Sequence, residues 1–225
     1  MPRWEPKPIW AGRDCFIVGG GPSLRGFDFS LLRAERAIGC NNAFRLGPEV
    51  CDYCVFVDRK FIIGPDGKPR SGFYDGLAEF GNPVITSEPR LRDRPERWLY
   101  WYPRKAQGLH RDALGYNYNC GATAINAALL LGATTVYLLG FDMHLGDGGE
   151  PNWHSHLIDR PSPNVYFRML AAFAHVKRDL AEKFPGCRIV NVNDDSALKC
   201  FPTVGTAQFW AERARAGKEA AACGS

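Results

Sequence analysis

Histidines and carboxylates gather in one short, glycine-rich stretch of the chain. His144, His154 and His156 fall within thirteen residues, close to Asp142 and Asp147. An imidazole titrates near neutral pH, so such a stretch suits a general base that a substrate must reach. We therefore place the candidate catalytic residues here, and they are His154, His156 and Asp142.

Two other interpretations of this stretch stay open. His154 and His156 could ligate a metal together with Asp142, although their spacing matches no closed structural zinc site. A solvated loop of histidines without chemistry is the other alternative. Cys51 and Cys54 form a C-x-x-C spacing without a second pair, so we interpret them as two core thiols. We expect no bound metal and no cofactor.

Two apolar segments run directly into glycine turns. Residues 14–18 lead into Gly19-Gly20-Gly21-Pro22-Ser23, and residues 135–139 lead into Gly140-Phe141-Asp142. Such runs are typical of buried parallel strands, and a glycine after the strand lets a phosphate approach the backbone. The first turn lacks the third glycine of a dinucleotide fingerprint and the Gly-Lys-Ser/Thr of a P-loop. It predicts a nucleotide crevice of another kind, and a tight turn without a ligand is the alternative.

The elements that must position these groups alternate along the chain. Strands are predicted at 15–18, 37–40, 54–57, 83–86, 136–139 and 189–192. Helices are predicted at 27–32, 121–131, 165–183, 196–198 and 208–222. Asn41 follows the second strand, where it could bind a ribose or phosphate or only complete a turn. The alternation favours an α/β fold: a single Rossmann-like domain, mostly parallel sheet with helices on both faces, and a loop-rich insertion.

Composition limits the class of protein. The chain has 225 residues, 45% of them hydrophobic, which suits one domain with a sizeable core. The eight cysteines lie mostly in apolar segments, and the amino terminus does not resemble a secretory signal. No apolar stretch approaches the roughly 18 to 20 residues that span a bilayer. We expect reduced thiols, a cytoplasmic location and no membrane span.

The segment 88–118 is basic and aromatic without a clear period, which predicts an insertion outside the sheet. Its stretch 90–105 holds five arginines and one lysine against two acidic residues. Cations follow phosphates, and aromatic rings stack on bases or sugars. The candidate acceptor-binding residues are Arg97, Trp98, Trp101 and Arg104. A solvated loop that closes the core, or a homo-oligomer contact, is the alternative.

Six short pieces, taken in order, resemble the Rossmann-like bacterial sialyltransferases. They are Ile-Val-Gly-Gly-Gly-Pro-Ser-Leu at 17–24, Gly-Cys-Asn at 39–41, Asn-Cys-Gly at 119–121, Val-Tyr-Leu-Leu-Gly-Phe-Asp at 136–142, His-Ser at 154–155, and residues 191–198. They also resemble a wider group with archaeal hydroxymethylpterin pyrophosphokinases and poorly described phage proteins. The likeness spans about residues 14–201 and depends on the order of the pieces.

The resemblance implies a division of the chain and a set of roles. A nucleotide-sugar-binding domain would span 13–205, with a lid-like loop at 143–164, between an extension at 1–12 and a helical tail at 206–225. The family's catalytic base, a His followed by Ser, corresponds to His154, with His156 as the fallback. Asp142 would orient a histidine or bind a sugar hydroxyl. The implied donor-binding residues are Gly19, Gly20, Gly21, Ser23, Asn41, Asp58, Cys120, Gly121 and His144.

Four of these positions depart from the family. Gly20 and Asp58 stand where it has Asn, Cys120 stands where it has Ser, and His144 stands where a phosphate-contacting Tyr is expected. The implied activity is a metal-independent glycosyltransferase that moves a sugar from a nucleotide-sugar donor to an acceptor hydroxyl. The acceptor would be a saccharide or a hydroxymethylated base of phage DNA, in a bacterium or a phage-infected host. A pyrophosphokinase-like nucleotide enzyme and a noncatalytic nucleotide-binding phage protein are the alternatives.

Overall fold

An eight-stranded parallel sheet forms the centre of the computed structural model, which describes residues 1–156 and 162–223. Its strand order is β10-β9-β8-β1-β2-β3-β4-β5, and β6 and β7 form a separate parallel pair. The strands are β1 Asp14–Val18, β2 Ala37–Cys40, β3 Tyr53–Phe56, β4 Val84–Thr86, β5 Leu99–Trp101, β6 Arg104–Lys105, β7 Leu114–Gly115, β8 Thr135–Leu139, β9 Arg188–Val192 and β10 Thr203–Val204.

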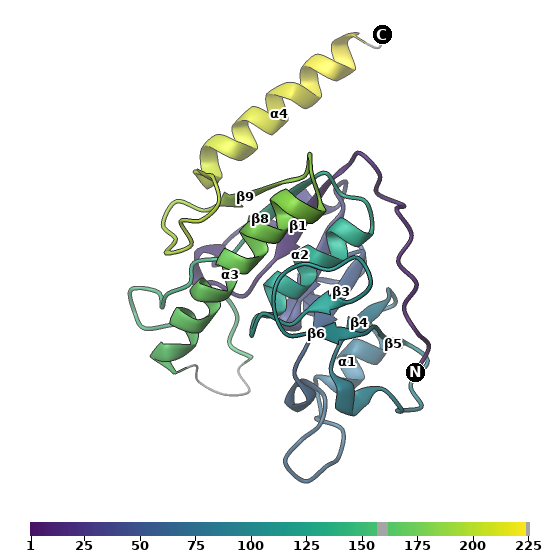
Figure 1. Cartoon of the computed structure of the whole chain (residues 1–225). Coiled ribbons are helices and arrows are strands. Elements are labelled where there is room, and N and C mark those ends of the chain that lie inside the picture. The colour runs from purple at the N-terminus through teal and green to yellow at the C-terminus, as the bar shows by residue number, and fades with distance from the viewer. Residues whose placement is uncertain (157–161, 224–225) are drawn as a thin grey trace.

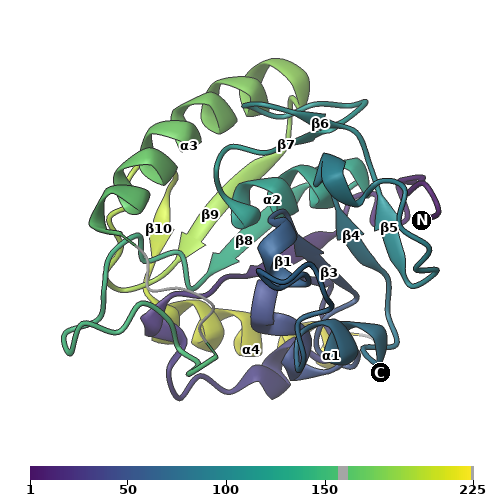
Figure 2. The ribbon, with the colours of Figure 1, turned by 90° about the horizontal axis from the view of Figure 1, so that it is seen from below.

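Helices cover both faces of this sheet, as the sequence predicts. Helices α2 and α3 lie on one face and α1 and α4 on the other (Figure 2). The α-helices are α1 Tyr74–Ala78, α2 Cys120–Leu130, α3 Pro163–Lys183 and α4 Thr206–Cys223. Short 3-10 helices span Pro22–Leu24, Phe29–Leu32, Asn41–Leu46, Arg59–Phe61 and Pro89–Leu91. The single-domain α/β fold is confirmed.

Strand β1 shows why the central strands are apolar throughout. Successive side chains of a strand point to opposite faces, so Cys15 and Ile17 enter the core beneath α2 and α3. Phe16 and Val18 enter the second core, on the side of α1 and α4. All four side chains are buried, because both faces of a parallel sheet are covered.

The amino-terminal segment and α4 extend along or beyond the sheet (Figure 1). The first residues run beside the sheet, where Trp4 and Trp10 are buried and bond through their backbone N–H groups to Trp101 and Leu131. Helix α4 packs Phe209 and Trp210 against Phe16, and its later turns project away from the body. No helix in the described part of the chain has the length and apolar character needed to cross a membrane.

The sequence analysis places the segment 88–118 outside the sheet, and for part of the segment this prediction is wrong. Leu99–Trp101 forms edge strand β5 beside β4, with Leu99 fully buried. A strand of three residues is too short to display an alternating pattern, so periodicity could not reveal it.

Two predicted helices also need correction. The helix predicted at 196–198 is wrong, because the Ser196 hydroxyl donates to the Phe141 carbonyl and accepts from the Leu198 N–H. Serine competes in this way with the hydrogen bonds of a helix. The predicted helix at 27–32 is a 3-10 helix at Phe29–Leu32, capped by the Asp28 side chain, which accepts from the Ser30 N–H.

Candidate active site

The glycine turns after β1 and β8 meet at the carboxyl edge of the sheet. Gly19 N–H donates to the Leu139 carbonyl at 2.8 Å, and Gly21 N–H donates to the Gly140 carbonyl at 2.9 Å. A Cβ at Gly21 would lie 2.6 Å from the Gly140 oxygen and 1.6 Å from Asp142 Oδ2, so only glycine fits there. We call residues 19–21 and Gly140 the glycine wall. In the sheet, β2 to β5 follow on one side of β1, and β8 to β10 follow on its other side. The strand order therefore reverses between β1 and β8, and the glycine wall lies at this point.

Asp142 stabilises the glycine wall on the side away from the cavity. Its carboxylate is only 2% exposed, and it accepts from the Ser23 N–H and the Ser23 hydroxyl, both at 3.0 Å. Asn193 donates to the same hydroxyl at 3.2 Å. These charge-assisted bonds hold the two turns together. Asp142 therefore contacts Ser23 instead of a histidine, and neither residue is on the lining of the cavity described next.

A cavity of about 470 Å³ opens in front of the glycine wall. The carboxyl ends of β1, β2, β3 and β8 and the N-terminus of α2 border it, and α3 supplies the opposite wall. Eight of the predicted donor-binding residues line it: Gly19, Gly20, Gly21, Asn41, Asp58, Cys120, Gly121 and His144. The structure thus brings together residues that are more than a hundred positions apart in the sequence.

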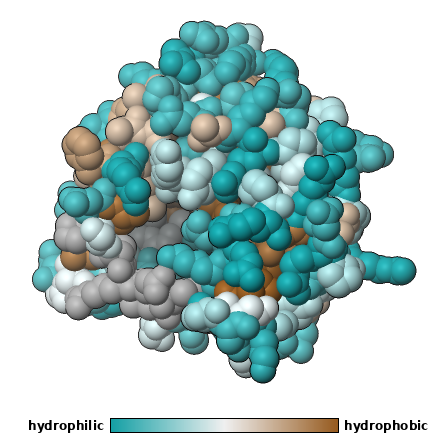
Figure 3. Space-filling model, turned by 60° about the horizontal axis from the view of Figure 1, so that its bottom comes forward, coloured by the Kyte–Doolittle hydropathy of each residue, from teal (hydrophilic) through white to brown (hydrophobic). Residues whose placement is uncertain are grey.

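Figure 3 shows the end of the molecule on which this edge of the sheet opens. Most of the visible surface is hydrophilic, and hydrophobic residues appear recessed between hydrophilic ones. A smaller hollow of about 180 Å³ adjoins the cavity through Gly20, Asn41 and Asp58 and reaches His154 and His156. Both predicted bases therefore lie beside the predicted donor residues. On their other side, they border an open hollow of about 880 Å³.

His154 is held as a neutral imidazole. Its pKa is lowered to about 4, mainly by burial and to a lesser extent by the nearby His156 and Arg45. Its ring packs edge-on against Trp153, with centroids 5.0 Å apart, and its buried Nδ1 has no partner in the described part of the chain. At neutral pH such an imidazole carries no charge, and its lone pair is free to accept a proton.

His144 has the opposite character. Its Nδ1 lies 2.7 Å from the Leu145 carbonyl and its Nε2 lies 3.3 Å from the Asp195 carbonyl. These acceptors favour the protonated ring, so the pKa of His144 rises above its usual value, with Leu145 as the largest cause. The environment of His144, in the cavity, therefore favours the protonated ring, and that of His154, in the adjoining hollow, favours the neutral ring.

The loop that carries His154 rests on the glycine wall. Trp153 donates from its backbone N–H to the Gly20 carbonyl at 3.0 Å and from its indole to the Gly19 carbonyl at 3.1 Å. The Asn152 amide, oriented to donate, lies 3.1 Å from the same Gly20 carbonyl. A Cβ at Gly20 would lie 2.8 Å from the Asn152 side-chain oxygen, so a larger residue at position 20 would have to displace the Asn152 side chain. The predicted lid at 143–164 includes residues 157–161, which lie outside the described residues.

Asn119 is a site residue that the sequence analysis missed. It caps α2, where its Oδ1 accepts from the Gly121 and Ala122 N–H groups. The side chain lines the cavity and is only 6% exposed, yet its Nδ2 has no partner among the described residues. Buried polar atoms are nearly always satisfied, so this donor indicates a ligand or water in the cavity. Its only sequence signal is an Asn before a run of small residues that opens a helix.

Cys120 departs from its predicted contact, although it lines the cavity. Its thiol donates to the Val55 carbonyl at 3.0 Å, and burial raises its pKa well above the usual value. Six other cysteines are also free thiols: Cys15, Cys40, Cys51, Cys54, Cys187 and Cys200. No group of three or more His, Cys, Asp or Glu side chains that could hold a metal ion exists among the residues the structure describes.

The predicted acceptor residues do not converge on the cavity. Trp98 packs edge-on against Tyr74 with centroids 5.4 Å apart, and Trp101 lies on β5 beneath Arg92. Arg97 is exposed beside them. Only Arg104 approaches the site, because its guanidinium lies 4.3 Å from the ring centroid of Tyr116, whose hydroxyl donates to Asp58 at 3.5 Å.

Backbone strain is concentrated at the same place. Four non-glycine residues of the described chain have positive φ: Asn41, Asn117, Tyr118 and Met143. Asn41 and Met143 line the cavity, and Asn117 and Tyr118 immediately precede Asn119 on its border. Such conformations cost about 1 to 3 kcal/mol each and cluster at functional sites.

No protein-family model matches the chain, and no curated protein matches it. Among solved structures, its fold is similar to the MAf glycosyltransferase from Magnetospirillum magneticum AMB-1, with a TM-score of 0.59 and 20% identity over 92% of this chain. The match covers 35% of that protein, so this chain spans about a third of its length.

A second solved structure is similar over most of its length. The sialyltransferase CstII from Campylobacter jejuni, in complex with cytidine-5'-monophosphate, has a TM-score of 0.52 and 14% identity over 86% of this chain and 85% of that one. At these identities the likeness shows a shared fold. The α/β fold of this chain is therefore shared with two glycosyltransferases of known structure.

Proposed function

We propose that this chain is a glycosyltransferase that moves a sugar from a nucleotide-sugar donor to an acceptor hydroxyl. The observation that carries the proposal is the meeting of four parallel strand ends and the N-terminus of α2 at one cavity, with two histidines in the adjoining hollow. Nucleotides bind open parallel sheets at this edge, where strand order reverses. The similar fold of a sialyltransferase solved with cytidine-5'-monophosphate supports a nucleotide in this cavity.

The donor's phosphate would lie between the glycine wall and the N-terminus of α2. The Gly20 N–H has no partner among the described residues, and the Asn119 amide offers a second donor. A helix N-terminus favours negative charge, and the raised pKa of His144 adds positive charge at the border. These groups would stabilise the charge that develops as the bond between the anomeric carbon and the phosphate oxygen breaks.

His154 would act as the general base. As the acceptor oxygen forms its bond to the anomeric carbon, its proton would pass to the neutral imidazole. The pKa of about 4 keeps that ring unprotonated at neutral pH, at the expense of basicity. Asp142 would be a positioning residue, because both of its carboxylate oxygens are engaged by Ser23.

The test separates donor binding from turnover. We expect thermal stabilisation by one member of a panel of CMP-, UDP-, GDP- and dTDP-sugars, because a ligand that binds only the folded state raises its stability. With that donor, His154→Gln should lower nucleotide release by a factor of roughly 10² or more, while the midpoint shift on donor addition is kept. His175→Gln, on α3 outside the cavity lining, is the matched control.

Three results would change this proposal. Full turnover in His154→Gln, with a loss in His156→Gln, would transfer the base to His156. Stabilisation by ATP only in the presence of magnesium would favour the pyrophosphokinase-like alternative. Binding of a nucleotide-sugar without nucleotide release, with saccharide or hydroxymethylated DNA acceptors present, would favour a noncatalytic nucleotide-binding protein.

A further inference from the structure

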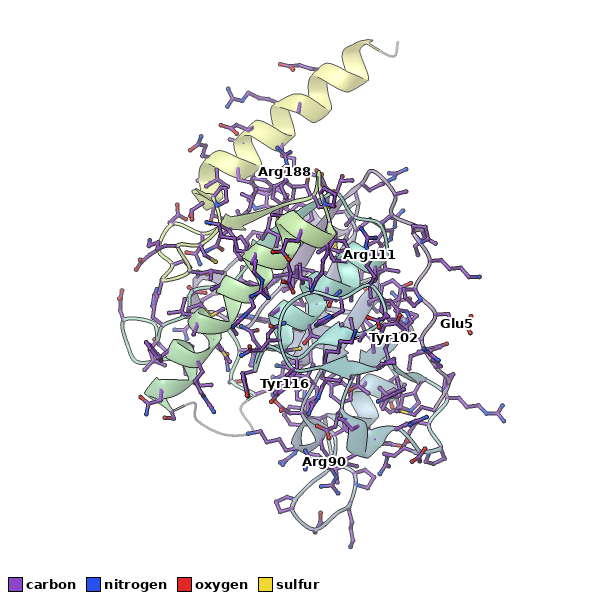
Figure 4. All side chains as sticks on the ribbon, in the orientation of Figure 1. Glu5, Arg90, Tyr102, Arg111, Tyr116 and Arg188 are labelled. Atoms are coloured by element: carbon purple, nitrogen blue, oxygen red, sulfur yellow. The ribbon has the colours of Figure 1, made fainter. Side chains whose placement is uncertain are left out.

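Two tyrosines stand at the border of the cavity without a role in donor binding. The rings of Tyr116 and Tyr118 pack edge to face, with centroids 5.3 Å apart and planes at 60°. Tyr118 is 47% exposed, although it lies one residue before Asn119 and two before Cys120, which both line the cavity. Figure 4 shows Tyr116 toward the same end of the molecule as Arg90, away from Arg111 and Arg188.

The backbone holds Tyr118 in an unfavourable conformation. Asn117 and Tyr118 are consecutive left-handed residues, with φ of 51° and 53°. The buried Asn117 side chain fixes them, because it accepts from the Gly108 N–H at 2.7 Å and donates to the Gly108 carbonyl at 3.0 Å. A bulky residue at positive φ is an outlier. Core packing does not explain it, since the ring is nearly half exposed.

Arginines flank both rings. The Arg104 guanidinium lies 4.3 Å from the Tyr116 centroid, and that of Arg168, from α3, lies 5.8 Å from the Tyr118 centroid. Two arginines share the Glu88 carboxylate. Arg90 Nε lies 2.7 Å from its Oε1, and Arg104 Nη1 lies 3.6 Å from its Oε2. None of the ion pairs found among the described residues involves Arg168. The border therefore carries surplus positive charge.

We propose that Tyr116, Tyr118, Arg104 and Arg168 form an acceptor subsite, and that the acceptor is an acidic saccharide. This inference rests on the proposed glycosyltransferase activity. The apolar C–H face of a sugar ring would pack on the exposed Tyr118 ring, whose face is electron-rich. A carboxylate or phosphate on the saccharide would pair with Arg168, which has the planar donors that such anions match.

The local charges favour a saccharide over a nucleic acid. Proteins that bind single-stranded nucleic acid combine a positive groove with successive aromatic rings on which bases stack. Here the edge-to-face pair leaves one ring widely exposed, and the carboxylates of Asp58 and Glu88 lie close by. A compact acidic sugar can direct its single charge to Arg168 and its hydroxyls to Asp58.

The hollow on the far side of the histidines is less suited to an anion. Arg25 there already pairs with Glu150 at 2.9 Å. Arg45 donates to the Gly72 carbonyl at 2.7 Å and stacks on Phe44 and Phe73. An incoming anion would have to displace these partners, whereas no ion pair with another described residue holds Arg168.

The experiment measures saccharide binding without a donor. A disaccharide that ends in glucuronic acid, its neutral glucose counterpart and a hydroxymethylated single-stranded oligonucleotide are titrated against the full chain by calorimetry. We expect the acidic disaccharide to bind about tenfold more tightly than the neutral one, a difference of about 1.4 kcal/mol. Tyr118→Asn keeps a residue that tolerates positive φ but removes the ring, so it should weaken this binding about tenfold.

Two variants serve as controls. Tyr118→Phe keeps the ring and should bind the acidic disaccharide normally. Arg97→Ala removes an exposed arginine of the same segment that does not reach the cavity and should also leave binding unchanged. Equal binding of the two disaccharides, tighter binding of the oligonucleotide, or normal binding by Tyr118→Asn would overturn the subsite.

Nucleotide release is followed separately in the same variants. Unaltered release from the donor with no preference for the acidic sugar would contradict the subsite and leave the proposed function standing. Tyr118-dependent binding of the acidic sugar, with no release from any donor, would support the subsite as a binding site and contradict the proposed function.

Discussion

The two sides of the cavity are built by different means. The glycine wall is main chain, fixed by hydrogen bonds between the turns after β1 and β8 and closed from behind by Asp142. The remaining groups at the site, here called the side-chain wall, are Asn119, His144, Arg168 and the loop with His154. The Asn119 amide has no partner for its Nδ2 among the described residues, and the pKa values of His144 and His154 are shifted in opposite directions. The main chain sets the shape of the cavity, and the side chains set its chemistry.

A methyl group added to the glycine wall should have the largest effect on stability. In Gly21→Ala the new Cβ would meet both the Gly140 carbonyl and the buried Asp142 carboxylate, at 2.6 and 1.6 Å. Neither can move without breaking the bonds that join the turns. We expect a loss of about 3 kcal/mol in the free energy of unfolding, measured by urea titration, at the upper end for overpacked sites.

Gly20→Ala is the matched control one residue away. Its Cβ would meet only the end of the Asn152 side chain, at 2.8 Å, and that side chain can rotate. The expected loss is about 1 kcal/mol or less. Equal losses in the two variants would contradict the tight fit of Gly21 against the Gly140 carbonyl and Asp142.

The side-chain wall should respond to pH instead. The pKa of His154 is about 4 in the folded chain, against about 6.5 for an unperturbed histidine. Between these values the unfolded state binds more protons, so this group makes stability fall as pH decreases from about 6.5 toward 4. His154→Gln should therefore lose less stability than the wild type over that window, as measured by urea unfolding at successive pH values.

His144 provides the control with the opposite sign. Its raised pKa means that protonation stabilises the folded state, fully below the unfolded pKa and less as pH rises through the folded pKa. His144→Gln should therefore lower the free energy of unfolding at pH values below the pKa of His144 and leave it unchanged at pH values above that pKa. Identical pH profiles for the two variants and the wild type would contradict the assigned environments.

The sequence predicts the glycine wall better than the side-chain wall, for a physical reason. A buried strand that ends in glycine is a local pattern, so residues 14–21 and 135–142 reveal the sheet edge without knowledge of the rest of the fold. The three glycines 19–21 of this pattern line the cavity, together with five residues that the family resemblance, and not the local pattern, implied. Asn119 has only the local signal of a helix cap, and Arg168 has none, because their places at the site depend on an unsatisfied amide and on the path of α3.

The basic aromatic segment illustrates how composition can mislead. Trp98 and Trp101 share their type and spacing with residues that bind ligands, yet Leu99–Trp101 pairs with β4 and the rings pack beside the sheet. Edge strands bury one side of such rings whether or not a ligand exists. The sequence does not distinguish these two residues from Tyr118. In the fold, Tyr118 is exposed and directly precedes Asn119, the N-cap of the helix that borders the cavity.

Substitution of Cys120 tests whether this residue belongs to the glycine wall or to the side-chain wall. We expect its effect on stability to be the smallest of those predicted here. The thiol lines the cavity but donates to the Val55 carbonyl, so we assign its side chain to the structural support of the glycine wall. Cys120→Ser can make the same bond with nearly the same volume. We expect a change in unfolding free energy of about 1 kcal/mol or less and an unchanged donor-induced thermal shift.

The comparison variant is Cys120→Ala, which leaves the Val55 carbonyl without this donor. It should lose more stability than Cys120→Ser, by roughly 1 kcal/mol, while the donor-induced shift stays the same. A donor shift that increases in Cys120→Ser would mean that the hydroxyl turns from Val55 toward the ligand. Position 120 would then belong to the side-chain wall, next to Asn119.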